Sequence, residues 1–204
     1  MVQTKIEICN MALALCGTRR ITAMDNPSRE ARACNDNYDI CRRAILRRHR
    51  WNFATKRVIL STVSATVPAF GYTNAFNLPD DFIRVHTVYT GELVIDTADY
   101  RIEQGLVLSD KDELWLKYVY DIEDTTQFDP LFDRYLAATL AETVSPQLNA
   151  SESNLQMIQR QMKDAGHEAK FVDGVEDPSE DLDVDVWLQA RSSVNLGFVR
   201  DPMT

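Results

Sequence analysis

The chain has 204 residues, of which 45% are apolar and 26% are charged, and its net charge is −9. This composition is ordinary for a globular protein with one sizeable domain or two small ones that share a core. The negative net charge argues against a protein whose main role is to coat nucleic acid.

The sequence contains no membrane anchor and no secretion signal. No run approaches the roughly 20 apolar residues of a membrane span, and the N-terminus lacks a signal-peptide pattern. The cysteines at 9, 16, 34 and 41 lie on predicted helical faces, which indicates reduced core thiols in a protein made in a cytoplasm. Each pair is separated by seven residues, about 10.5 Å along a helix, which is too far for one zinc site.

The first predicted helix begins at a capping box and ends at a glycine. Thr4 and Glu7 have the capping-box spacing, and Gly17 supplies the C-terminal stop. Between them the sequence leaves almost no polar face. A helix that is apolar all round is buried in its own domain or covered by another subunit.

The second predicted helix, residues 27–49, has Asn26 as N-cap and Pro27 as its first residue, a position that needs no backbone N–H. One narrow apolar stripe follows at steps of three and four: Ala31, Cys34, Tyr38, Cys41 and Ile45. The end of the helix and the residues after it carry a basic and aromatic cluster: Arg42, Arg43, Arg47, Arg48, Arg50 and Trp51.

Two interpretations of these arginines stay open. Cations suit the C-terminal end of a helix, and Asp39 can pair with Arg42 or Arg43. The same cluster can contact an anion, either a phosphate backbone or an acidic neighbouring subunit. Trp51 and Phe53 are expected in the core or an interface, because alternate positions after a helix indicate a strand entering the fold.

Residues 56–121 change from helical to strand periodicity. Short segments rich in Val, Ile, Tyr and Thr alternate with turn residues, which predicts six or seven antiparallel strands. We interpret them as a β-subdomain inserted between two helical halves, 1–55 and 127–172. Leu78-Pro79 followed by Asp80-Asp81 predicts a turn before a new strand at Phe82.

Helical periodicity returns at Asp129-Pro130, an N-cap followed by Pro at the first helical position. Pro146 is expected to end this helix, and Ser151 or Ser153 can cap the next one. The predicted fold class is therefore α+β: a bundle of about four long helices, the inserted β-subdomain and an extended C-terminal arm.

Residues 173–204 are predicted to form an acidic linker and a docking arm. The linker holds seven acids and no base over 173–185. Apolar residues beyond such a linker suggest an arm that orders on a partner, with Val186, Trp187, Leu188 and Arg191 as the docking residues. The equal alternative is that Trp187 folds back on the parent domain.

Recognisable catalytic motifs are absent. There is no P-loop, dinucleotide-binding, GxSxG or HExxH pattern, and the three histidines lie in separate elements. The acids at Asp80-Asp81 and at Asp181, Asp183 and Asp185 have no context that supports metal-dependent chemistry. We expect no enzyme activity, no catalytic residue, no cofactor and no metal site.

Five stretches, in this order and spacing, resemble the tail tubular protein A family of short-tailed bacteriophages, the head-to-tail adaptors. They extend over most of residues 6–148: ICNMALALCG with ITAMD, SREARACNDNYDICRRAIL, RHRWNFA, FGYTNAFNLPDDFIRV and FDPLFDRYLAATLAETVSPQL. The resemblance implies a structural virion protein with no catalytic residues.

The resemblance implies a ring, typically of twelve copies, between the portal protein and a tail nozzle similar to tail tubular protein B. Genomic DNA would pass through its channel during ejection without sequence-specific binding. The protein would be assembled in the host cytoplasm and reside at the head–tail junction of the virion, with the arm docked on the portal. The alternative function is a DNA-binding regulatory protein that uses the basic helix 27–49.

Overall fold

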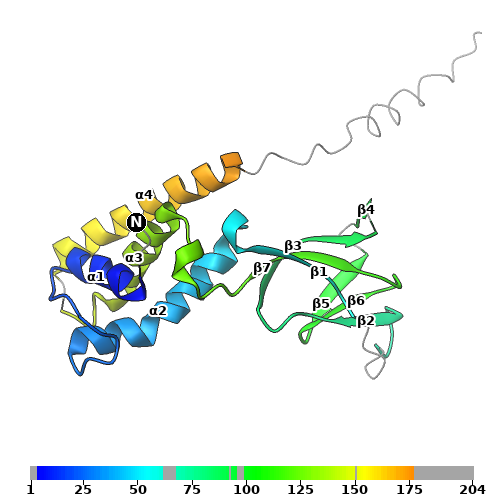
Figure 1. Cartoon of the computed structure of the whole chain (residues 1–204), viewed down its shortest axis with the longest axis horizontal. Coiled ribbons are helices and arrows are strands. Elements are labelled where there is room, and N and C mark those ends of the chain that lie inside the picture. The colour runs from blue at the N-terminus through cyan, green and yellow to red at the C-terminus, as the bar shows by residue number, and fades with distance from the viewer. Residues whose placement is uncertain (1–3, 62–67, 92, 96–98, 150, 177–204) are drawn as a thin grey trace, which may run out of the picture.

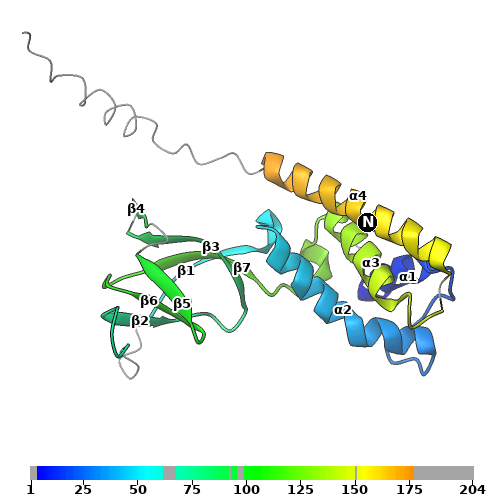
Figure 2. The ribbon, with the colours of Figure 1, turned by 180° about the vertical axis from the view of Figure 1, so that it is seen from behind.

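The computed structural model describes residues 4–61, 68–91, 93–95, 99–149 and 151–176 (Figure 1). These residues form four α-helices and seven strands in two antiparallel sheets, which confirms the predicted α+β class. The helices occupy one end of an elongated molecule and the sheets the other, as the two opposite views show (Figures 1 and 2). The predicted docking residues of the C-terminal arm lie outside the described residues.

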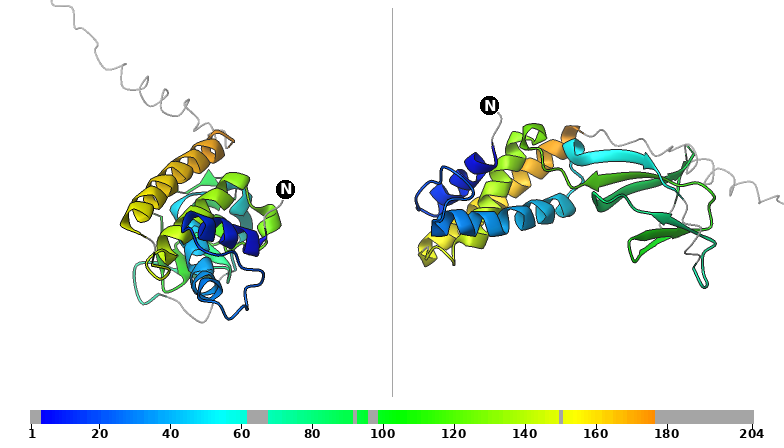
Figure 3. Two further views of the ribbon diagram at one scale, coloured as in Figure 1. Left: turned by 90° about the vertical axis from the view of Figure 1, so that its left-hand side faces the viewer. Right: turned by 60° about the horizontal axis from the view of Figure 1, so that its bottom comes forward.

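The helices are α1 (Lys5–Leu15), α2 (Arg29–Arg48), α3 (Pro130–Val144) and α4 (Glu152–Glu176), with short 3-10 turns at Asn52–Ala54 and Thr125–Gln127. Helix α3 is central, because it packs against α1, α2 and α4. Figure 3 shows α2 beside the other helices with its C-terminal end toward the strands. No helix among the described residues is long and apolar enough to span a membrane.

Helix α1 has the predicted caps. The side chain of Thr4 accepts a hydrogen bond from the backbone N–H of Glu7, and the Glu7 carboxylate accepts one from the backbone of Thr4. Gly17 follows the helix with a φ of 69°, a conformation that glycine adopts without steric cost. The buried side chain of Asn10 then fixes the next loop by exchanging two hydrogen bonds with the backbone of Ile21, at 2.8 and 2.9 Å.

The predicted start of α2 is wrong by two residues. Ser28, and not Asn26, is the N-cap: its backbone is extended and its hydroxyl accepts a hydrogen bond from the N–H of Ala31. The side chain of Asn26 instead accepts a hydrogen bond from the N–H of Ser28, which makes a turn before the helix. Pro27 therefore lies outside α2. The predicted apolar stripe is buried along its length.

The chain leaves α2 through a turn and not through the predicted strand. Asn52–Ala54 form a 3-10 turn, and the first strand begins at Thr55. The expected core position of Trp51 and Phe53 is confirmed: Trp51 is buried, and Phe53 packs against the same cluster. Their rings reach Phe132 of α3 with centroid distances of 5.1 and 4.9 Å.

Helix α3 begins and ends where the sequence predicts, and α4 begins there too but extends past the predicted end at 172 to Glu176. The carboxylate of Asp129 caps α3, and α3 ends at Val144, just before Pro146. The hydroxyl of Ser151 accepts a hydrogen bond from the N–H of Asn154 at the start of α4. The apolar stripe of α3 is fully buried: Phe132, Leu136, Leu140 and Val144.

The strands are β1 (Thr55–Ile59), β2 (Asn74–Asn77), β3 (Phe82–Thr90), β4 (Leu93–Val94), β5 (Tyr100–Glu103), β6 (Leu106–Ser109) and β7 (Trp115–Tyr120). One sheet has the order β1-β7-β3-β4 and the other β2-β6-β5. The predicted turn at Asp80-Asp81 precedes β3. A second hydrophobic cluster joins the two sheets and includes Phe76, Val88, Val107, Leu116 and Tyr118.

The four-stranded sheet is joined to the helices by apolar side chains at one end. Ile83 of β3, Val119 of β7 and Ile122 after β7 belong to the hydrophobic cluster of the helices. Along β7, Leu116 and Tyr118 face the second cluster, whereas Val119 enters the first. The sheet therefore contributes to both cores, which fixes its position against α2.

Gly166 of α4 provides a test of the α3–α4 packing. A Cβ at this position would lie 2.7 Å from a ring carbon of Tyr135, and that ring is buried with its hydroxyl bonded to Arg48. We expect Gly166→Ala to lower the free energy of unfolding by about 1–3 kcal/mol, because the ring has little room to move. Gly174→Ala is the control, since a Cβ there meets nothing within 4 Å and Ala favours a helix. Equal effects in urea unfolding would contradict the packing argument.

Asp133 of α3 predicts a pH-dependent stability. Burial, with the negative charge of Asp129, raises the pKa of this carboxyl from 3.8 to about 7, and its Oδ1 has no hydrogen-bond partner among the described residues. Because the folded-state pKa lies above the unfolded value, the free energy of unfolding should fall as pH rises from about 4 to about 7. We expect Asp133→Asn to flatten this dependence in urea titrations across that range. Asp164→Asn, at an exposed site of α4, should leave it unchanged.

Candidate interaction surfaces

The predicted anion-contacting cluster is divided by the structure, and Arg42 is not at the surface. Its side chain is 2% exposed. Nη1 donates to the Asp121 carboxylate at 2.5 Å and to the backbone carbonyl of Ile122, and Nε donates to Asp39 at 3.4 Å. A buried guanidinium requires paired donors, and these partners provide them. Arg42 therefore attaches α2 to the segment after β7 and is not available to an external anion.

Arg43 lies one residue further along α2 and is exposed. Its Nε is 2.9 Å from the second oxygen of Asp121, so one carboxylate bridges a buried and a solvent-facing arginine. An exposed ion pair contributes little to stability, because water screens it and two long side chains must be ordered. Arg43 is thus free to exchange Asp121 for another anion at low cost.

The remaining arginines of the cluster are exposed, and two of them hold neighbouring elements. Arg47 donates to the backbone carbonyl of Ile83 in β3 at 2.6 Å, and Arg48 donates to the hydroxyl of Tyr135 at 3.2 Å. Arg84 of β3 returns a bond to the backbone carbonyl of Arg47. Arg50 makes no ion pair within the part of the chain that the structure describes. The accessible basic surface at this end of α2 therefore consists of Arg43, Arg47, Arg48 and Arg50.

Trp51 contributes to the core and not to an external surface. The indole is 1% exposed, and its N–H donates to the carbonyl of Ile45 at 3.1 Å. His49 lies edge-on to the indole, with ring centroids 4.8 Å apart. Both rings position the turn that leads from α2 to β1.

Asp173, predicted as the first residue of the acidic linker, instead fixes the end of α4 to this turn. One carboxylate oxygen lies 2.8 Å from Nε2 of His49, and the other accepts the backbone N–H of Asn52 at 3.0 Å. The Asn52 amide donates in turn to the Asp173 carbonyl at 2.8 Å. The predicted linker begins at 173, whereas α4 continues to Glu176. The point from which residues 177–204 leave the helices is therefore fixed near the start of β1.

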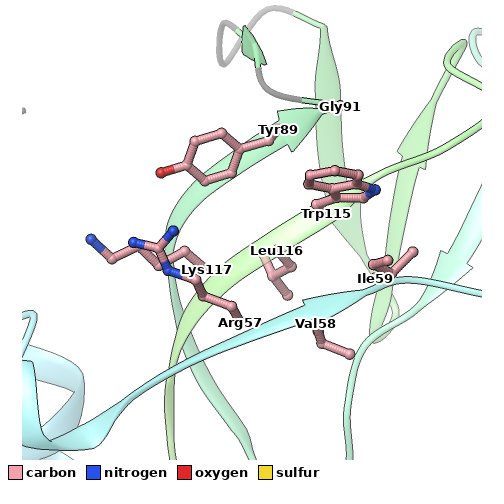
Figure 4. Close-up of a pocket in the computed structure, with 8 residues that line it drawn as sticks. All are labelled: Arg57, Val58, Ile59, Tyr89, Gly91, Trp115, Leu116 and Lys117. Carbon is pink, nitrogen blue, oxygen red and sulfur yellow. The ribbon is translucent and has the colours of Figure 1, made fainter.

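The outer face of the four-stranded sheet carries a pocket of about 400 Å³ (Figure 4). Strand pairing places Arg57 opposite Lys117, and Ile59, Trp115 and Tyr89 side by side on three adjacent strands. The result is a row of two cations next to an apolar and aromatic row. We call these five residues, Arg57, Ile59, Tyr89, Trp115 and Lys117, the sheet platform.

The sheet platform has an uncompensated positive charge. Like charges directly opposite each other on neighbouring strands destabilise a sheet, and no described carboxylate forms an ion pair with Arg57 or Lys117. Just before β7, Glu113 accepts a hydrogen bond from the Trp115 indole at 2.7 Å. Figure 4 shows the indole nitrogen on the side away from the two cations, so Glu113 does not neutralise them.

The sequence analysis did not detect the sheet platform, although it identified the strands. Arg57 and Ile59, like Trp115 and Lys117, alternate with core residues, and this spacing places each pair on one face. The pattern does not say that β1 pairs with β7, which are more than 50 residues apart in the chain. That pairing brings the cations together.

The acidic pair at Asp80-Asp81 is part of the fold. The Asp81 carboxylate contacts Lys56 at 2.7 Å and accepts the hydroxyl of Tyr118 at 2.8 Å. Burial raises the pKa of Asp81, but these two hydrogen bonds outweigh it and hold the pKa below its usual value. Among the described residues no group of three or more His, Cys, Asp or Glu side chains is placed to hold a metal ion.

Neither the models of known protein families nor the proteins of established function match this chain.

Arg42 and Arg43 provide a matched pair of substitutions. We expect Arg42→Met to lower the free energy of unfolding by about 3 kcal/mol or more, because it removes the buried partner of Asp121 and the donor to Ile122. Arg43→Met should change it by less than about 1 kcal/mol, since that arginine is exposed. Urea unfolding measures both. Similar losses for the two variants would show that the buried guanidinium does not attach α2 to the sheet.

Proposed function

We propose that the protein is a structural head-to-tail adaptor of a bacteriophage virion. It forms a ring, of twelve copies by the family resemblance, between the portal and the tail nozzle, and its channel passes genomic DNA during ejection. It carries no catalytic site. The strands β1 to β7 are a subdomain inserted between the two halves of a helical bundle, and residues 177–204 are the portal-docking arm.

The observation that carries this proposal is that the five resembling stretches pack against one another. Asn10 of the first stretch bonds to Ile21, which follows it in the same stretch. Trp51 of the third packs on Phe132 of the fifth, and Ile83 of the fourth belongs to the same hydrophobic cluster. Cys41 of the second lies 3.4 Å from the hydroxyl of Thr143 in the fifth. Similar residues that were scattered by chance would not be expected to form a single set of contacts.

The exposed surfaces support assembly through different patches on neighbouring copies. Phe171 and Val175 lie one turn apart near the end of α4 and are 73% and 68% exposed. The four exposed arginines at the end of α2 form a basic surface, whereas the chain as a whole is acidic. A heterologous contact joins one such patch to a different patch on the next copy, and repetition of that contact closes a ring.

Net negative charge suits a channel in which DNA slides, because cationic walls would bind phosphates and retain the genome. We therefore propose that the bore is lined by acidic or neutral side chains. A map of the ring with a continuous belt of Arg and Lys on the bore would contradict this.

The alternative is a DNA-binding regulator that uses helix 27–49. Fewer residues are available to contact DNA than the sequence suggested. Arg42 and Trp51 are buried, which leaves Arg43, Arg47, Arg48 and Arg50 as exposed contacts. Such a protein should bind duplex DNA in isolation, with an affinity that falls steeply as salt rises.

Light scattering with the cognate portal ring tests the adaptor proposal. We expect a single mass for the chain alone and a stoichiometric multi-copy complex when the portal is added. Deletion of residues 177–204 should abolish the complex and leave the helical content unchanged, because every described contact of the four helices is kept. The full chain with Lys163→Gln, an exposed position of α4 outside these patches, serves as a surface control that keeps portal binding.

Portal binding by the truncated chain would remove the arm from the proposal. A full-length chain that ignores the portal and shifts duplex DNA at low salt would replace the adaptor by the regulator.

A further inference from the structure

The sheet platform is the part of the outer sheet face that the helices leave uncovered. Along this face of β7 the residues are Val119, Lys117 and Trp115, and their partners on β1 are Thr55, Arg57 and Ile59. Val119 is buried in the helical cluster, whereas the next two positions line an open pocket. The sheet face thus passes from core to solvent within four residues.

We propose that residues 181–188 of the same chain, Asp-Leu-Asp-Val-Asp-Val-Trp-Leu, lie across the sheet platform before the protein meets its partners. This inference concerns the free chain and does not rest on the adaptor function. The acidic segment supplies negative charge to Arg57 and Lys117, and Trp187 and its apolar neighbours cover the exposed Ile59 and the half-buried rings of Trp115 and Tyr89.

Charge complementarity identifies this segment as the occupant. Residues 171–190 contain seven acids and no base, while the two cations of the sheet platform form no ion pair with any carboxylate of the described residues. The hydroxyl of Tyr89, which Figure 4 shows directed toward the same end as the cations, has no hydrogen-bond partner among the described residues. A carboxylate placed between Arg57 and Lys117 would satisfy both charges.

The alternation of the segment matches the two rows of the platform. In an extended chain Asp181, Asp183 and Asp185 project to one side, and Leu182, Val184 and Val186 project to the other. The cation row and the aromatic row are separated by two residues along each strand, roughly 7 Å. A segment that runs along the rows therefore presents its acids to Arg57 and Lys117 and its apolar side chains to Ile59, Trp115 and Tyr89.

The segment after α4 is long enough to reach the sheet platform. Asp173 is hydrogen-bonded to Asn52. Arg57 of the sheet platform lies five residues after Asn52 and is therefore at most roughly 17 Å from it. From Glu176, where α4 ends, five extended residues reach Asp181 and also span roughly 17 Å. The anchor at Asp173 thus sets the acidic segment within range of the platform of its own copy.

Zero-length carbodiimide cross-linking of the full-length chain tests this placement. Equal amounts of unlabelled and ¹⁵N-labelled protein are mixed, cross-linked and digested, and the linked peptides are weighed by mass spectrometry. We expect Lys117 to link to Asp181, Asp183 or Asp185 within copies of one label. Lys163, an exposed lysine of α4, is the internal control and should form at least about five-fold fewer such links.

Arg57→Glu should reduce the Lys117 links about five-fold or more, because it replaces an attraction by a repulsion. Arg50→Glu makes the same charge change at an exposed position near the Asp173 anchor and should leave them unchanged. Circular dichroism of both variants verifies that they are folded.

Three outcomes would overturn the proposal. Links that join light to heavy peptides would assign the platform to a second copy of the chain. Equal yields at Lys117 and Lys163, or yields insensitive to Arg57→Glu, would mean that the segment does not dock. Protection of Lys117 by single-stranded DNA, without links to the acidic segment, would make the platform a nucleic-acid surface. The portal measurement is separate, so failure of either proposal is distinguishable from failure of the other.

Discussion

The attachment of the sheets to the helices depends on one buried charge. The Arg42 guanidinium lies between α2 and the segment after β7, where Asp121 and the carbonyl of Ile122 receive its donors. A cation in a low-dielectric site is tolerated only in a geometry that pairs it, so the constraint is directional as well as energetic. Ile83 and Val119 bury apolar surface around the Arg42 guanidinium. These contacts are non-directional and would persist if the sheet rotated slightly against the helices, whereas the hydrogen bonds of the guanidinium would not.

This attachment determines which surfaces remain for partners. Because α2 meets only the near end of the four-stranded sheet, the far end of its outer face stays open as the sheet platform. Because the same helix end uses Arg42 and Trp51 internally, its accessible basic surface is reduced to Arg43, Arg47, Arg48 and Arg50. One element thus divides the basic residues of the chain into a structural group and two exposed groups, at the helix end and on the sheet.

Local sequence signals predicted much of this fold. The capping box at Thr4, the Asp129-Pro130 start of α3 and the stop at Pro146 depend on neighbours in the chain, and the structure has them. The start of α2 was wrong because Asn26 and Ser28 are both good caps, and only the three-dimensional turn decides between them. The functions of Arg42, Asp173 and Lys117 were not readable, because their partners Asp121, Asn52 and Arg57 are 60 or more residues away.

The anchor at Asp173 also has a mechanical consequence. Less than one helical turn separates it from Glu176, so tension on the C-terminal segment loads the bonds to Asn52 and His49 before it loads the interior of α4. Asn52 lies between the last turn of α2 and the first residues of β1, so the pull is divided between the helical and the sheet ends of the molecule. A chain built in this way transmits force through the junction between α2 and β1, and α4 is spared from unwinding.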